Sequence, residues 1–98
     1  DDAQVPGGDY HLDALDIGFG LRPDLTGRGL AQGFVQAIMA WGRHCFEPEY
    51  FRATVADINV RSQRTLARAG FLITQRFHAD GGEPHDFIVM IRGANPAE

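Results

Sequence analysis

The sequence predicts a mixed α/β domain whose elements follow the order β-α-β-α-β-β. Apolar residues recur at near period two over residues 10–21, which is typical of a strand, and at spacings of three and four over 30–46, which is typical of a helix. A β-branched and aromatic run follows at 50–56. A helix between two strands predicts a right-handed crossover with parallel strands.

The first elements have recognisable ends. Residues 1–9 combine polar side chains with proline and paired glycine, which predicts a loop. The strand over 10–21 slips in phase around Leu15 and Asp16, which suggests a bulge. Arg22-Pro23-Asp24 ends that strand. The helix over 30–46, ended by Pro48, is expected to bury one face, formed by Leu30, Phe34, Ile38, Trp41 and Cys45.

Three further elements complete the order. Asp57-Ile58-Asn59 forms a junction to a short helix over 60–69, which Gly70 ends because glycine readily adopts the left-handed conformation. Strands are then expected over 71–79 and 86–92, joined by a turn-rich hairpin loop at 80–85.

Composition limits the class of protein. A chain of 98 residues that is 44% hydrophobic and 22% charged predicts one small globular domain. No run approaches the roughly 18 apolar residues of a membrane helix, so we expect no membrane partner. Cys45, the only cysteine, excludes an internal disulfide and fits a cytoplasmic protein. The histidines show no metal-ligand spacing, so we expect no metal; they are His11, His44, His78 and His85.

Charge is distributed unevenly along the chain. The formal net charge is -4, yet residues 25–76 hold seven arginines and three acidic residues. All nine basic residues are arginine, which suits multidentate contacts to phosphate or carboxylate, although a genomic bias against lysine codons explains this equally well. The basic middle suggests an anionic ligand, and the acidic balance argues against a nucleic-acid partner.

Gly27-Arg28-Gly29 lies between the first predicted strand and helix. Two glycines one residue apart allow a tight curl, so that unpaired N–H groups at the helix start can point into a concavity that suits a pyrophosphate. A plain glycine-rich turn is the alternative. The segment lacks the Gly-Lys-Ser/Thr of a P-loop and the second glycine pair of a dinucleotide fingerprint.

This segment resembles the acyl-CoA motif of the GNAT superfamily of N-acetyltransferases, Arg/Gln-x-x-Gly-x-Gly/Ala, which here reads Thr26-Gly27-Arg28-Gly29-Leu30-Ala31. Thr26 departs from this pattern, because it stands at the position of the arginine or glutamine. Residues 59–71 are similar to the family's Asn...Gly-Phe segment, in the Asn-x-x-Ser form of the branch that acetylates protein N-termini, ribosomal proteins included, and of relatives that act on small amines. The resemblance spans residues 12–92 and the later part of the family domain.

The resemblance implies a GNAT-like fold and an acetyl-CoA-dependent N-acetyltransferase. A primary amine, either a protein N-terminus or a small amine, would attack the thioester directly. The strand before the glycines would splay from its parallel neighbour, and the pantetheine arm would lie in the gap. The implied cofactor-binding residues are Phe19, Leu21, Thr26, Gly27, Arg28, Gly29, Leu30, Ala31, Gln32, Asn59 and Arg64.

Two side chains are candidates for proton transfer. Asp16 could act as general base or hold a water that does; capping a bulge or pairing with an arginine is its alternative role. Ser62 could pass a proton to the leaving thiolate, or only cap the helix, as Asn59 could. Leu66 stands where many family members carry a tyrosine acid. Arg64, with Arg61 and Arg68, shares one helix face that could meet phosphates or be solvated.

The upstream strands and helices of the family domain have no counterpart in this sequence. We therefore expect residues 1–98 to be the cofactor-binding portion of a larger domain, or a half-domain completed by a partner, as in a homodimer. A catalytically silent acyl-CoA-binding module is the first alternative function. A structural interaction domain without affinity for CoA is the second.

Overall fold

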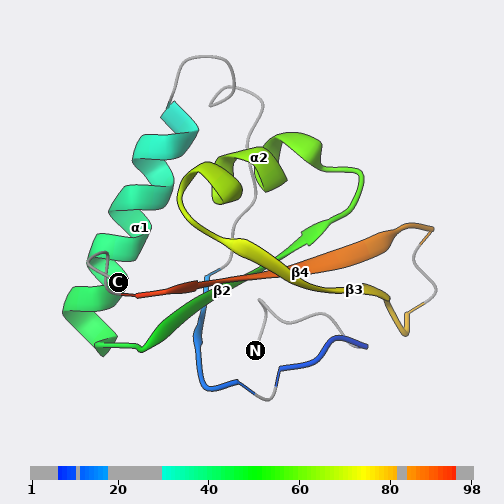
Figure 1. Ribbon diagram of the computed structural model, residues 1–98, viewed down its shortest axis with the longest axis horizontal. Helices are drawn as coiled ribbons and strands as arrows, with labels where there is room; N and C mark the ends of the chain where they lie inside the picture. Colours follow the sequence, from blue (N-terminus) through cyan, green and yellow to red (C-terminus); the bar gives the residue numbers. More distant parts are fainter. Residues whose placement is uncertain (1–6, 11, 18–29, 82–83, 95–98) are drawn as a thin grey trace.

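A computed structural model describes residues 7–10, 12–17, 30–81 and 84–94 (Figure 1). Its strands and helices follow the predicted order β-α-β-α-β-β, which confirms the mixed α/β class. The elements are β1 (Leu15–Asp16), α1 (Leu30–Phe46), β2 (Tyr50–Ala56), α2 (Val60–Arg68), β3 (Leu72–His78) and β4 (Asp86–Gly93).

The strands form one mixed sheet in the order β1-β2-β4-β3. β1 runs parallel to β2, with Leu15 opposite Phe51, and the Ile17 N–H extends this ladder by donating to the Arg52 carbonyl at 2.8 Å. β4 is antiparallel to both of its neighbours, as the predicted hairpin requires, and β3 carries an irregularity between Ile73 and Gln75. The sheet therefore combines one parallel pair with an antiparallel hairpin.

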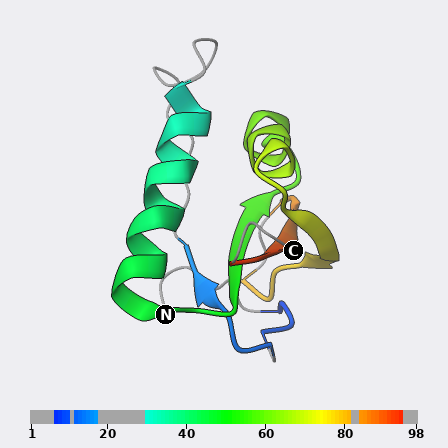
Figure 2. The same ribbon diagram turned by 60° about the vertical axis from the view of Figure 1, so that its left-hand side comes forward.

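Figure 2 shows both helices beside the sheet. Residues of the helices and of the sheet form one core cluster. α1 supplies Val35 and Met39, α2 supplies Leu66, and Ala69 follows α2 directly; β2 and β4 supply alternate residues. The sheet members of this core are Phe51, Ala53, Val55, Ile88 and Met90. Because alternate strand residues share one face, the two helices cover the same side of the sheet.

The buried face of α1 differs in part from the predicted one: Ile38 packs against the core as predicted, and the side chain of Leu30 lies outside the described part of the chain. Trp41 is 59% exposed, and Phe34 and Cys45 are exposed as well, whereas Val35, Met39 and Gly42 are buried. The physical reason lies at Gly42, where a Cβ atom would come within 2.9 Å of both the Leu15 side chain and the Phe51 ring. α1 approaches the sheet through the residue without a side chain, and its apolar stripe is rotated accordingly.

The first strand is shorter than predicted, because it begins at Leu15 and not at Tyr10. The Tyr10 hydroxyl instead hydrogen-bonds the Thr54 hydroxyl at 2.9 Å, and the Asp9 N–H donates to the Gln75 side chain at 2.6 Å. These bonds hold the N-terminal residues against side chains of the sheet, outside the strand ladder. The phase slip in the sequence lies at the start of β1, where Leu15 and Asp16 pair in regular register with Phe51 and Arg52, so the bulge predicted around these two residues is wrong.

Local sequence signals, such as helix caps and turn residues, predicted the ends of the later elements closely. Asn59 caps α2, since its side chain accepts a hydrogen bond from the Ser62 N–H at 3.2 Å. The helix ends at Arg68, one residue before the prediction, and Gly70 has the expected positive φ of 97°. α2, β3 and β4 each end within one residue of the predicted positions. Among the described residues, no helix is long and apolar enough to cross a membrane.

Candidate functional site

The candidate site lies where the parallel strands β1 and β2 lead into the two helices. In open α/β sheets, ligands bind outside the carboxyl ends of parallel strands, where helix N-termini are exposed. α1 begins at Leu30, after the glycine segment, and α2 begins at Val60, directly after Asn59. Six predicted cofactor residues lie outside the described residues: Phe19, Leu21, Thr26, Gly27, Arg28 and Gly29. Leu30 and Ala31 form the first turn of α1.

Gln32 joins the start of α1 to α2. Its side-chain Nε2 donates a hydrogen bond to the main-chain carbonyl of Thr65 at 2.8 Å. The same carbonyl accepts the Ala69 N–H at 3.1 Å, as expected within a helical end. The family resemblance implied that Gln32 binds the cofactor; the structure shows that its side chain bridges the two helices.

Asn59 and Ser62 lie together at the first turn of α2. The cap role weighed for Asn59 is realised, through its bond to the Ser62 N–H. The Ser62 side chain is fully buried, and within the described part of the chain its hydroxyl has no hydrogen-bond partner. A buried hydroxyl without a partner costs about 1–3 kcal/mol, so this group is an unsatisfied donor beside the carboxyl end of β2.

Asp16 is paired with Arg52, the second of the two roles weighed for it. Arg52 Nε and Nη2 donate to the two carboxylate oxygens at 2.5 Å and 2.7 Å, and Nη1 donates to the Leu12 carbonyl at 2.7 Å. The guanidinium also lies 4.9 Å from the centre of the Tyr10 ring. The hydrogen bond and charge of Asp16 raise the pKa of Arg52 above its ordinary value.

Arg52 is only 2% exposed, and sequence reasoning did not single it out. A signal was available, because Arg52 is the one charged residue of the strand Tyr-Phe-Arg-Ala-Thr-Val-Ala. A buried arginine requires a partner, and Asp16 of the adjacent strand supplies it.

The predicted cofactor residue Arg64 is exposed and lines a groove of about 360 Å³ between α2 and β3. Arg61 and Arg68 are exposed too, which agrees with a solvated face. The groove is mainly apolar, and its other lining residues are Val60, Gln63, Ala67, Phe71, Leu72, Ile73 and Met90. The structure therefore places Arg64 on the β3 side of α2, whereas Gln32 bonds to Thr65 from α1.

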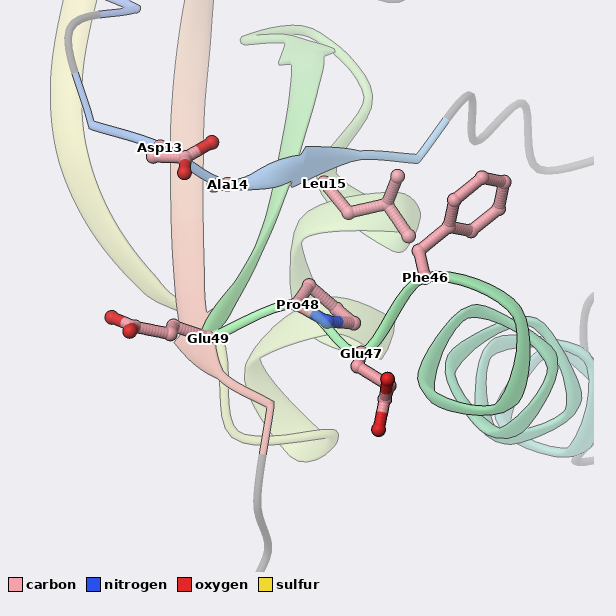
Figure 3. A pocket seen from close by; sticks show the side chains of 7 residues that line it. All are labelled: Asp13, Ala14, Leu15, Phe46, Glu47, Pro48 and Glu49. Atoms are coloured by element: carbon pink, nitrogen blue, oxygen red, sulfur yellow. The ribbon is translucent and has the colours of Figure 1, made fainter.

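A second pocket of about 360 Å³ lies at the other end of α1 (Figure 3). Its lining combines three carboxylates with apolar side chains: Asp13, Ala14, Leu15, Phe46, Glu47, Pro48 and Glu49. Because α1 has 17 residues, this pocket is about 25 Å along the helix from its first turn. It is therefore separate from the candidate cofactor site. The described residues contain no group of three or more side chains that could hold a metal ion.

Comparison with known protein families decides the affiliation of the chain. Residues 4–72 match the family described as "Acetyltransferase (GNAT) domain". The chain belongs to this GNAT family. The match spans the glycine segment, β1, α1, β2 and α2, so it contains every element that borders the candidate site. No curated protein matches the chain.

Solved structures show the same GNAT fold. The chain is 19% identical to yncA of Salmonella typhimurium, solved with its cofactor acetyl-CoA, with a TM-score of 0.67 over 83% of the chain and 49% of yncA. A GNAT-family acetyltransferase from Bacillus anthracis is 21% identical, with a TM-score of 0.69 over 90% of the chain and 55% of that protein.

A third similar structure is spermidine N-acetyltransferase from Vibrio cholerae, in complex with CoA and spermine. It is 16% identical, with a TM-score of 0.64 over 81% of the chain and 50% of that enzyme. The chain thus spans about half the length of these GNAT structures.

Proposed function

We propose that this GNAT chain is the cofactor-binding portion of an acetyl-CoA-dependent N-acetyltransferase. The family match over residues 4–72 carries the proposal, because it includes both the glycine segment and Asn59. Acetyl-CoA would be held at the carboxyl ends of β1 and β2, and a primary amine would attack its thioester directly. We place the reaction in the cytoplasm, in keeping with a chain that has a single cysteine.

The described residues fit such a cofactor. Asn59 ends the β2–α2 junction with a side chain that can contact a pantetheine arm, and the unpartnered Ser62 hydroxyl lies in the same helical turn. The first turn of α1 follows Gly27 and Gly29, so its free N–H groups and helix dipole favour the diphosphate. The bound cofactor would supply an activated acetyl thioester.

The chain's own residues would contribute mainly by positioning. Holding the thioester beside the amine replaces an encounter between two molecules by a reaction within one complex. Main-chain donors at the site would polarise the thioester carbonyl. We assign the Ser62 hydroxyl the role of a relay, because it is a buried donor without a partner among the described residues: it would give its proton to the leaving thiolate while it takes the proton that the attacking amine loses. Asp16 keeps β1 in register with β2 through Arg52.

Calorimetry with acetyl-CoA and CoA tests the binding step. We expect Gly29→Val to weaken binding at least tenfold, because a side chain there would keep the phosphates away from the main-chain amides. Gly33→Val is the matched control on the same helix, since a Cβ atom at Gly33 meets nothing within 4 Å. Equal affinity of folded Gly29→Val and wild-type protein would refute this cofactor site.

Release of the CoA thiol in the presence of amines separates the candidate functions. Turnover with a peptide N-terminus would place the chain in the branch that acetylates protein N-termini, and turnover with a polyamine would place it with enzymes that acetylate small amines. Binding of acetyl-CoA without turnover of any amine would identify a silent acyl-CoA-binding module. Failure to bind acetyl-CoA would leave only a structural interaction domain.

A further inference from the structure

We propose that the side chain of Gln32 is a positioning residue that sets the distance between the two halves of the cofactor site. The proposal rests on the proposed function, because it concerns how one ligand spans that site. One half is the start of α1, which would hold the diphosphate. The other half is the carboxyl end of β2 with Asn59, which would hold the pantetheine arm.

The Gln32 hydrogen bond connects these halves through α2. Gln32 is the third residue of α1, and its Nε2 donates to the Thr65 carbonyl of α2 at 2.8 Å. On its other side, α2 is tied to the end of β2 by Gln63, whose Nε2 donates to the carbonyls of Asp57 at 2.8 Å and Ala56 at 3.2 Å. The two glutamines form a polar connection from the first turn of α1 to the end of β2.

Apolar packing alone would not fix this spacing. Val35 and Met39 hold α1 to the sheet from its second turn onward, and their contacts have no preferred direction along the helix axis. A hydrogen bond requires a donor–acceptor distance near 2.9 Å and an almost linear N–H group, so it fixes the first turn of α1 relative to α2. Gln32 is partly exposed, so water can replace its bond at little cost to stability.

A ligand that spans both halves depends on their distance, whereas a fragment that occupies one half does not. CoA binds both halves, so the second contact forms at a high effective concentration only when the spacing is correct. ADP carries the diphosphate half of CoA, and pantetheine carries the other half. These three ligands therefore separate a change in spacing from damage to either half.

The experiment compares Gln32→Leu with the wild-type protein for CoA, ADP and pantetheine, by calorimetry or by displacement of bound CoA. We expect the affinity for CoA to fall about tenfold, while the affinities for ADP and pantetheine each change less than about twofold. Gln32→Ala repeats the comparison with a different side chain. Thermal unfolding shows that both variants are folded.

Gln75→Leu is the matched control. Gln75 lies on β3, and its side chain also bonds a main-chain group, the N–H of Asp9 in the N-terminal segment. It is far from α1 in the sequence. The Gln75→Leu variant should bind CoA, ADP and pantetheine with unchanged affinities. An unchanged CoA affinity in both Gln32 variants would overturn the proposal, as would an equal loss for all three ligands. Failure of the wild-type protein to bind any of them would refute the proposed function itself.

Discussion

Asp16 and Arg52 join the parallel strands β1 and β2 through a two-pronged ion pair in the protein interior. Their side chains are 6% and 3% exposed, and the two residues are direct partners in the strand register. Among the described residues, β1 has two residues paired with β2, and the Ile17 N–H adds one further bond to the ladder. The ion pair therefore adds to a short attachment. The pair therefore holds β1 at the position from which the chain enters the candidate site.

Removing one partner of this pair should destabilise the fold strongly. Asp16→Ala leaves a buried guanidinium without its counter-charge, and we expect the free energy of unfolding to fall by about 3–5 kcal/mol. The double variant Asp16→Leu with Arg52→Met removes both charges and should lose less than Asp16→Ala alone. Urea unfolding measures all of these variants. If the double variant lost as much stability as Asp16→Leu and Arg52→Met lose together as single variants, the two residues would not be coupled.

The pH dependence of catalysis distinguishes a structural from a chemical role of Asp16. Both carboxylate oxygens of Asp16 accept hydrogen bonds from Arg52, and this contact raises the pKa of Arg52, so the guanidinium stays charged through neutral pH. A raised pKa of Arg52 stabilises the fold at every pH below the ordinary pKa of arginine, and this contribution is lost only as the pH rises through the raised value.

We therefore expect Asp16→Asn to lower the maximal rate of acetyl transfer without moving the acidic limb of the pH–rate profile. Ser62→Ala is the companion variant, since Ser62 is buried in the first turn of α2 and carries no charge. It should reduce the rate less than Asp16→Asn does. An acidic limb that shifts in Asp16→Asn would instead establish Asp16 as the general base.

Two glycines of α1 should respond oppositely to alanine. At Gly42 a Cβ atom would clash with Leu15 and Phe51 at 2.9 Å, and overpacking of this kind costs about 1–3 kcal/mol. At Gly33 a Cβ atom meets nothing within 4 Å, so Gly33→Ala should stabilise the helix by about 0.5–1 kcal/mol. Thermal unfolding of the two variants tests the packing of α1. If both variants shifted the melting temperature in the same direction, α1 would pack against the sheet in another way than described above.

The unpartnered Ser62 hydroxyl should be dispensable for stability. Ser62→Ala removes a buried donor that has no partner among the described residues, so the melting temperature should stay the same or rise. Thr65→Val is the control in the same helix, because it removes a satisfied hydroxyl that donates to the Arg61 carbonyl at 2.9 Å. We expect that variant to lose about 1 kcal/mol. If Ser62→Ala lowered the free energy of unfolding by more than Thr65→Val does, the Ser62 hydroxyl would be hydrogen-bonded in solution.

Most element boundaries could be read from local patterns. The predicted helix over 30–46 and strand over 50–56 agree with α1 and β2 at both ends, and Gly70 ends α2 with a positive φ as expected. These features depend on periodicity, helix caps and turn residues, which act between neighbours along the chain. The glycine segment and Asn59 likewise indicated the family that the comparison confirmed.

The amino-acid order therefore determined which elements form and in what succession, and it predicts where the cofactor site lies. Tertiary contacts decided which face of α1 is buried, where β1 begins and which residue pairs with Asp16. Local patterns do not contain this information, because Gly42 meets Phe51 and Asp16 meets Arg52 only after the sheet brings distant segments together. The bond from Gln32 to Thr65 has the same origin: it spans 33 residues and exists only once α1 and α2 lie on one face of the sheet.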